Sequence, residues 1–221
     1  MLIACWSPKG GSGTTVVATA LGLILARSEG SSLLVDLAGD VPATLGLPEP
    51  AGPGLCEWLA AGADVPGDAL SRLEVDAAPG LRLLPRGQGP SGPLSGEHSP
   101  SGAAALVSAL GVERRPVVVD CGRADGGAAL AVAAEASLSL LVLRPCYLAL
   151  RRALAAPLRP SGVVLVAEQG RSLGRCDVEE VLGVPVRAEV AYDAAVARAV
   201  DAGLLSRRVP RALERSLRQA A

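Results

Sequence analysis

The chain has 221 residues, of which 50% are hydrophobic and 19% are charged, so it is long and apolar enough to fold rather than stay disordered. Its formal net charge of −1 gives no global attraction to nucleic acid or to an anionic membrane. Five cysteines without a C-x-x-C pair and a single histidine argue against a disulfide framework, a zinc site and histidine-based catalysis.

The first apolar run, residues 2–6, is followed by a glycine-rich turn and then by a segment rich in Ala, Leu and Val. A phosphate-binding loop is expected where a strand, a Gly-rich loop and a helix follow in this order. Glycines let backbone N–H groups converge on an anion, and the start of the helix adds the positive end of its dipole. The opening stretch therefore predicts a phosphate site.

The loop departs from the P-loop pattern G-x-x-x-x-G-K-[ST] at Pro8 and Thr14. The variant pattern K-G-G-x-G-K-[ST]-[ST] fits better and fails only at Thr14 and Val16. Lys9 is the single lysine among 21 Lys+Arg residues, and a compact ammonium is not interchangeable with a guanidinium among phosphates. These observations favour phosphate binding over an ordinary Gly-rich turn with a chance lysine.

Apolar runs of strand length then alternate with helical segments. We expect strands over residues 33–36, 81–84, 116–120, 137–143, 163–167 and 184–190, and helices within 37–47 and over 55–61, 64–72, 103–110, 147–156, 178–183, 193–202 and 207–220. Residues 86–102, rich in Gly, Pro and Ser, predict a flexible loop that is either a partner-binding insertion or a solvated linker. The alternation favours one α/β domain over residues 1–221, with a mostly parallel sheet covered by helices on both faces.

Two of the expected strands end in an aspartate, Asp36 and Asp120. The carboxyl ends of parallel strands form the edge at which open α/β sheets bind ligands. Four apolar residues followed by Asp120 are also typical of an acidic Mg²⁺ ligand beside a P-loop. The amino terminus lacks the basic region of a signal peptide, and residues 16–26 are shorter than the roughly 20 residues that span a bilayer, so we expect a cytoplasmic protein.

These segments together resemble the ParA/MinD family of P-loop ATPases, over nearly the whole chain. SPKGGSGTTV resembles the variant Walker A motif, LLVDLAGD the switch I segment and PVVVDCG the Walker B motif. LVLRPCYLALRRA resembles a later strand and helix of the family. GVVLVAEQGR and VLGVPVRAEVAYDAAVARAVDAGLL resemble the carboxyl-terminal segment that closes over adenine. Within the family, that last segment looks most like the CpaE/TadZ branch, which helps to localise pilus-assembly machinery.

The resemblance implies a P-loop NTPase fold that binds ATP or ADP with Mg²⁺. Thr15, Asp36 and Asp120 would bind the metal, and Tyr192 and Asp193 would touch the base. Lys9 would be the signature lysine that reaches across a nucleotide-sandwich homodimer. Because the second switch I acid is replaced by Ala38, Asp40 is the candidate catalytic acid beside Lys9. The residues that would cradle the nucleotide are Lys9, Gly10, Gly11, Ser12, Gly13, Thr14, Thr15 and Val16.

The chain departs from the family where the chemistry is most demanding. Thr14 replaces the lysine that contacts the β- and γ-phosphates, Ala167 replaces the base-reading Asn, and Ala191 replaces a proline. A lost charge-assisted hydrogen bond is worth about 1.5–3 kcal/mol, or roughly tenfold to a hundredfold in affinity. Hydrolysis should suffer more than binding, because the transition state depends on charge placement. Arg123 or Arg144 could supply the missing charge.

The resemblance therefore predicts a weak or inactive ATPase that acts as a positioning or assembly factor, through a homodimer and a protein partner. The alternatives are an active ATPase that cycles on DNA or at the inner face of the membrane, a nucleotide-free scaffold, and a synthetase that phosphorylates a carboxylate. The last would need a lysine at Thr14. For DNA or lipid contact the candidates are the basic residues of the final helix, although a solvated helix face is the favoured interpretation: Arg207, Arg208, Arg211, Arg215 and Arg218.

Overall fold

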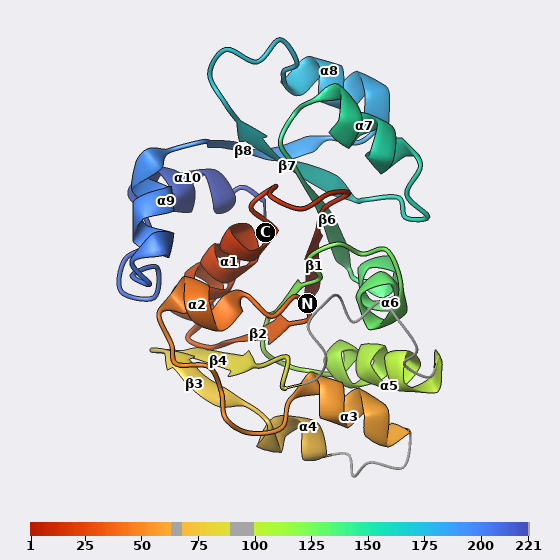
Figure 1. Ribbon diagram of the computed structural model, residues 1–221, viewed down its shortest axis with the longest axis vertical. Coiled ribbons are helices and arrows are strands. Elements are labelled where there is room, and N and C mark those ends of the chain that lie inside the picture. The colour runs from red at the N-terminus through yellow and green to blue at the C-terminus, as the bar shows by residue number, and fades with distance from the viewer. Residues whose placement is uncertain (63–67, 89–99, 221) are drawn as a thin grey trace.

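The structure is a computed structural model that describes residues 1–62, 68–88 and 100–220. Within these residues one eight-stranded sheet runs through the molecule (Figure 1). Its strands are β1 (Leu2–Trp6), β2 (Ser32–Asp36), β3 (Val75–Ala78), β4 (Leu81–Leu84), β5 (Val117–Asp120), β6 (Leu138–Leu143), β7 (Gly162–Ala167) and β8 (Val186–Ala191). The order across the sheet is β3-β4-β2-β5-β1-β6-β7-β8, and neighbours are parallel except for β3 and β4. The expected α/β class with a mostly parallel sheet is confirmed.

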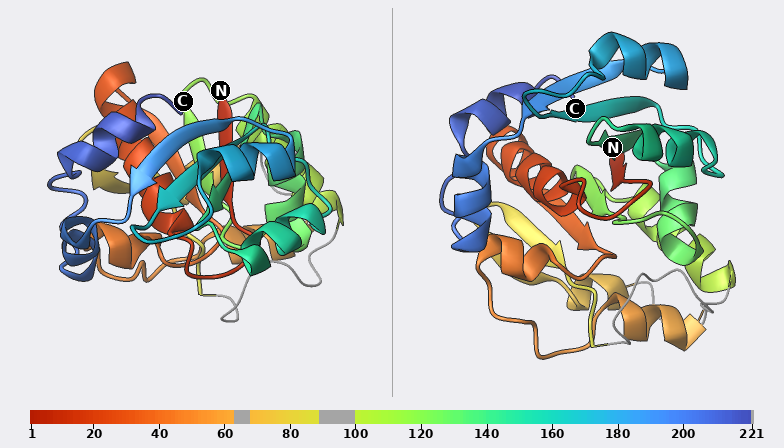
Figure 2. Two further views of the ribbon diagram at one scale, coloured as in Figure 1. Left: turned by 90° about the horizontal axis from the view of Figure 1, so that it is seen from above. Right: turned by 45° about the horizontal axis from the view of Figure 1, so that its top comes forward.

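Helices cover both faces of this sheet. They are α1 (Thr14–Glu29), α2 (Val41–Leu45), α3 (Leu55–Ala61), α4 (Ala69–Arg72), α5 (Pro100–Gly111), α6 (Gly127–Glu135), α7 (Tyr147–Leu154), α8 (Arg175–Leu182), α9 (Ala194–Asp201) and α10 (Arg211–Leu217). In both views of Figure 2, α10 lies beside α1 and α9 beside α2, on the side of the sheet opposite α5 and α6. Two separate apolar clusters, one on each face, form the core.

The central strands bury both of their faces, as expected for a parallel sheet covered on both sides. Side chains alternate between the two clusters along β1: Ile3 and Cys5 pack under α1, while Ala4 and Trp6 pack on the other face. The fully buried Trp6 donates its Nε1–H to the Ser139 hydroxyl at 3.0 Å, which satisfies its one polar group. This buried strand holds the glycine-rich loop at the carboxyl edge of the sheet.

Three parts of the chain differ from the sequence-based expectation. Strand β3 and helix α6 were not expected: β3 is a four-residue, half-exposed edge strand, and α6 is rich in Ala with little amphipathic pattern. Residues 100–102, expected in a loop, form the first turn of α5. Residues 89–99 of that loop and 63–67 of an expected helix lie outside the described residues, so only α4 of the latter is seen.

The final helix is shorter than expected, because it begins after Pro210. Its apolar residues Leu213 and Leu217, together with Val209 just before it, are buried in the cluster under α1 and β8. They leave no apolar face of α10 for a lipid surface. In the part of the chain that the structure describes, no helix is long and apolar enough to cross a membrane.

Candidate functional site

The glycine-rich loop between β1 and α1 is held open by its own hydrogen bonds. The hydroxyls of Ser7 and Ser12 both donate to the Lys9 carbonyl, at 2.9 and 3.1 Å. Gly11 and Gly13 have φ angles of 76° and 87°, a backbone region that glycine enters without steric strain. A Cβ at either position would meet nothing within 4 Å, so the loop borders open space. Ser12 is buried and shapes the loop, a role that the pattern alone did not indicate.

The loop leads directly into α1, a helix of 16 residues. Gly13 occupies its N-cap position and no side chain caps the first turn, which also lacks an acidic residue. The unpaired N–H groups of that turn and the positive end of the helix dipole therefore face the space bordered by the glycines. This is the physical arrangement that attracts a phosphate group.

Asp36 and Asp120 lie side by side at the ends of β2 and β5, where the two residues are register partners. Both are completely buried. Asp36 accepts hydrogen bonds from the backbone N–H groups of Ala38, Gly39 and Val41, at 3.1, 2.6 and 3.2 Å. Asp120 accepts one from the Gly122 N–H at 3.1 Å through Oδ1, while its Oδ2 has no hydrogen-bond partner.

This pair of buried carboxyls holds its protons unusually tightly. Burial, reinforced by the charge of Asp36, raises the pKa of Asp120 to about 7, although the Thr15 hydroxyl and the Gly122 N–H lower it. Burial likewise raises the pKa of Asp36 to about 6 against the effect of its three N–H donors, and the charge of Asp40 adds to the rise. Among the described residues, neither acid forms an ion pair, although the buried Arg86 guanidinium donates to the neighbouring Leu37 carbonyl at 3.2 Å.

These groups fit a Mg²⁺ ion that is also bound to phosphate. Mg²⁺ is commonly held by one or two carboxylates together with phosphate oxygens and waters. The unpartnered oxygen of Asp120 beside Thr15 provides such a ligand. Among the described residues there is no cluster of three or more His, Cys, Asp or Glu that could hold a metal alone. The protein would thus supply only part of the ligand sphere.

A cavity of about 400 Å³ lies over the loop. Asp40 lies exposed at this cavity and Arg123 lines it from the turn after β5, while Lys9 is half-buried and does not line it. Among the described residues, no carboxylate forms an ion pair with Lys9. The other lining residues are Ser7, Gly10, Gly11, Ser12, Gly13, Thr14, Thr15, Val16, Leu37, Ala38, Cys121 and Gly122.

A second, smaller cavity of about 240 Å³ lies on the other side of the loop and is mostly apolar. It is bordered by Gly11–Gly13 and by valines of α1, β7, β8 and α9. Tyr192 lines it, and the Arg144 guanidinium lies over the tyrosine ring, 4.9 Å from its centroid. Arg144 also pairs with Glu168 at 3.0 Å. An apolar pocket beside a phosphate-binding loop suits a nucleotide base.

Residues 3–206 match the protein family described as CobQ/CobB/MinD/ParA nucleotide binding domain. The chain belongs to this family. No significant match was found among curated proteins. The ParA/MinD-type fold is shown by solved structures as well. A ParA family ATPase from Chlorobium tepidum TLS is 20% identical, with 98% of this chain and 96% of that chain covered and a TM-score of 0.77.

Two further structures similar to this ParA/MinD-type domain contain nucleotides. MinD from Pyrococcus horikoshii OT3, complexed with Mg-ADP, is 17% identical, with 99% and 93% of the two chains covered and a TM-score of 0.73. The Cyanothece McdA(D38A)–ATP complex is 20% identical, with 98% and 93% covered and a TM-score of 0.74. The sequence-based recognition of a ParA/MinD-type domain is confirmed at this level.

The ParA/MinD-type domain places the sequence-predicted site residues in two groups. The loop residues, Thr15, Asp36, Asp40 and Asp120 gather at the carboxyl edge of β1, β2 and β5, as their strand-end positions indicated. Tyr192 and Asp193 lie at the apolar cavity. The Asp193 Oδ1 accepts a hydrogen bond from the Ala195 N–H at 2.7 Å, so this carboxylate caps α9, as expected from the sequence.

Sequence reasoning missed Glu168, which fixes Arg144 beside the apolar cavity, and Ser7, whose Oγ holds the loop. Arg144 was singled out only as a spare positive charge. Nothing local marks Glu168, because it lies 24 residues from its partner.

Proposed function

We propose that this ParA/MinD-type domain binds ATP or ADP together with Mg²⁺. The phosphates lie against the loop N–H groups and the first turn of α1, the metal lies at Thr15 and Asp120, and the base enters the apolar cavity beside Tyr192. The observation that carries the proposal is the buried, unpartnered Oδ2 of Asp120 at the foot of an open glycine loop. A cation would stabilise that buried oxygen, and the N–H groups of the loop would stabilise an anion.

We propose further that hydrolysis is weak or absent. Thr14, which is 7% exposed, offers no positive charge to the terminal phosphates. Asp40, the candidate catalytic acid, is exposed, and no hydrogen bond to its side chain fixes it among the described residues. Catalysis of phosphoryl transfer depends on fixed charges placed against the transition state, and this site provides few of them.

The biological role that fits such a domain is a nucleotide-controlled positioning or assembly factor in the cytoplasm, of the CpaE/TadZ type. Lys9 is half-buried, and among the described residues it forms no ion pair, so its ammonium is available to a second copy of the chain. One similar structure, from Aquifex aeolicus, is a MinC:MinD cell division protein complex, which is an assembly with a protein partner. These observations support a homodimer that recruits a protein partner.

Calorimetric titration of ATP and ADP with Mg²⁺, alongside the mass from light scattering, tests this proposal. We expect ATP to bind and to dimerise the wild type, and Lys9→Ala to abolish dimerisation while the monomer still folds. Arg152→Ala, which removes an exposed charge away from both cavities, serves as the control. A dimer that forms equally without ATP would favour the nucleotide-free scaffold, and no binding at millimolar ATP would remove the proposal.

The alternative function is an active ATPase that cycles on DNA or at a membrane. One observation favours DNA as the binding surface of such an ATPase. A groove of about 670 Å³ along α9 and α10 is lined by Arg207, Arg208 and Arg211, all exposed. The apolar side of α10 is buried in the core, so α10 itself presents arginines, while Leu204, which is 42% exposed, adds an apolar residue to the groove. Such a surface suits phosphates of a polyanion better than a bilayer.

Fluorescence anisotropy with a short DNA duplex at two salt concentrations tests this alternative. Binding through the groove would weaken with salt and would be lost in the triple variant Arg207→Ala/Arg208→Ala/Arg211→Ala. The triple variant Arg151→Ala/Arg152→Ala/Arg159→Ala removes the same charge elsewhere and is the matched control. Equal losses in both variants would indicate a general charge effect instead of a binding groove.

A further inference from the structure

The cavity over the loop has an unbalanced set of charges. Asp40 lines it, and the buried Asp36 and Asp120 lie at its foot. Thr14 lines it as a neutral residue, where a P-loop ordinarily supplies a lysine. Among the described residues that border this cavity, Arg123 is the one basic side chain. A nucleotide with two or three phosphates would meet that cation and the loop amides.

The backbone at Arg123 is anchored to the glycine-rich loop. The Ser7 N–H donates to the Gly122 carbonyl at 2.9 Å, and the Ser7 hydroxyl contacts both the Gly122 and the Lys9 carbonyls. Gly122 has a φ angle of 54°, and a Cβ there would lie 3.1 Å from the Ala38 Cβ, so the turn packs closely against the segment after β2. Arg123 therefore starts from a fixed position beside the loop.

The Arg123 side chain, in contrast, is loosely held. It is 54% exposed and pairs with Asp125, itself 42% exposed, at 2.8 Å. An exposed pair of this kind contributes little to stability, because solvent and salt screen it. The guanidinium can exchange this partner for a phosphate oxygen without leaving a buried charge unpaired, and arginine matches phosphate geometry well.

Arg144, the other arginine near the loop, contacts residues at the apolar cavity instead. It lines the apolar cavity, lies over the Tyr192 ring and pairs with Glu168, which also binds Arg171 at 2.7 Å. Its charge lies toward the base and away from the terminal phosphates. The two arginines that the sequence left as equal candidates thus occupy different cavities.

We propose that Arg123 supplies the phosphate-binding positive charge that Thr14 lacks. This assignment rests on the proposed nucleotide binding and extends it to a particular residue. The cavity that Arg123 lines extends from the loop toward β5, on the side away from the apolar base pocket. Arg123 consequently contacts the β- and γ-phosphates, and it discriminates di- and triphosphates from a monophosphate.

The test is a set of calorimetric titrations with ATP, ADP and AMP, each with Mg²⁺. Arg123→Ala should weaken ATP and ADP about tenfold to a hundredfold and leave AMP nearly unchanged. Arg144→Ala should weaken all three alike, because it acts on the base pocket. Arg152→Ala should bind as the wild type does. An Arg123→Ala protein that keeps its ATP affinity, or that loses AMP affinity equally, would overturn the assignment.

Charge rescue provides the second arm. Thr14→Lys should restore ATP affinity in the Arg123→Ala background and should add far less in the wild type, since the two cations would serve one role. Equal gains in both backgrounds would overturn the assignment. Thr14 is buried, so a lysine at this position can disturb the fold. Arg123→Lys keeps the positive charge without changing Thr14 and should retain most of the ATP affinity. If the wild type binds none of the three nucleotides, the proposed function itself is wrong. If the wild type binds them and Arg123→Ala binds them equally well, only the assignment of Arg123 is wrong.

Discussion

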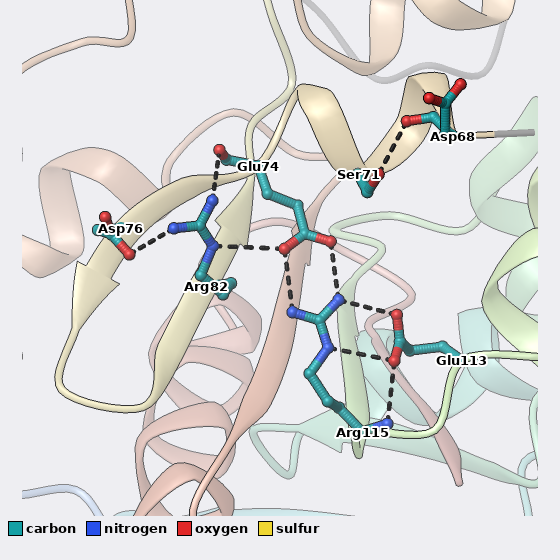
Figure 3. Close-up of polar contacts among 7 residues, drawn as sticks. All are labelled: Asp68, Ser71, Glu74, Asp76, Arg82, Glu113 and Arg115. Atoms are coloured by element: carbon teal, nitrogen blue, oxygen red, sulfur yellow. Dashed lines mark hydrogen bonds and ion pairs between the residues drawn. The ribbon is translucent and has the colours of Figure 1, made fainter. Parts of the chain in front are cut away.

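Two clusters of charged residues, one partly buried and one fully buried, behave in opposite ways in this protein. Near β3, the Glu74 carboxylate receives two hydrogen bonds from Arg115, at 2.7 and 3.0 Å, and Arg115 also bonds Glu113 at 2.8 Å (Figure 3). Arg82 approaches Glu74 from β4 at 3.4 Å and donates to its carbonyl. At the ends of β2 and β5, the buried Asp36 and Asp120 accept hydrogen bonds from backbone N–H groups and form no ion pair among the described residues.

The pKa values record this difference. Hydrogen bonding to Arg115 lowers the pKa of Glu113 to about 2, whereas burial raises the pKa of Asp120 to about 7. The arginine cluster is completed by the chain itself and ties the start of the β3–β4 hairpin to the segment before β5. Among the described residues, the aspartate pair forms no ion pair with an arginine or a lysine. This difference supports the proposed Mg²⁺ site at the aspartate pair.

Removing the cation from the completed cluster should have the largest effect. Arg115→Ala leaves Glu74, whose side chain is 8% exposed, with only the longer contact to Arg82. We expect about 3–5 kcal/mol of lost unfolding free energy, because a buried charge loses its partner. Urea denaturation measures it. Arg72→Ala, which breaks an exposed pair with Asp68, is the control and should lose less than about 1 kcal/mol. Similar losses in both variants would remove the distinction.

Neutralising the incomplete pair should instead stabilise the metal-free protein. The pKa of Asp120 is about 7 in the fold against an ordinary value of 3.8, so the protonated form is favoured. Below about pH 4, Asp120 is protonated in both the folded and the unfolded protein, and the folded protein keeps its full stability. As the pH rises through 7, the folded protein loses stability, because the buried side chain must ionise. Asp120→Asn should therefore gain on the order of 3 kcal/mol at pH 8 and almost nothing at pH 4.

Thermal unfolding at the two pH values, with EDTA present, measures this gain. Glu135→Gln removes a charge from an exposed position at the end of α6, outside the cavity, and should gain little at either pH. Added Mg²⁺ and ATP should stabilise the wild type more than Asp120→Asn. A gain at pH 8 that equals the gain at pH 4 would mean that Asp120 is not strained in the folded state.

The sequence allows the aspartate pair to be predicted but not the arginine cluster. An apolar run that ends in Asp marks the carboxyl end of a buried strand, and parallel strands bring such ends to one edge, so Asp36 and Asp120 could be placed together. Glu74 and Arg115 meet across 41 residues, and nothing local relates them. The edge strand β3 was missed for the same reason, because its pairing and not its four residues defines it.

At the candidate site too, features that depend on neighbouring residues could be predicted, and features that depend on long-range contacts could not. The glycine loop and its position before α1 depend on local backbone rules, and these could be read from ten consecutive residues. The separation of Arg123 from Arg144 depends on where β5 and β6 end relative to the loop and on the long-range contact of Arg144 with Tyr192. Residue types nominate candidates, and only tertiary placement distinguishes between them.

The smallest expected effect concerns the rim of the arginine cluster. The hydrogen bond from the Arg115 side chain lowers the pKa of Glu113 to about 2, and burial opposes this shift without cancelling it. Its contribution to stability is therefore present above the ordinary value of 4.5 and is lost as the pH falls toward 2. Glu113→Gln should lose about 1 kcal/mol at pH 7, since the side chain is partly exposed and solvent screens the pair. The loss should shrink as urea denaturation is repeated down to pH 3, the opposite pH trend to that of Asp120→Asn. A loss that stayed constant with pH would show that Glu113 acts through packing, and the contrast between the two clusters would then rest on Glu74 alone.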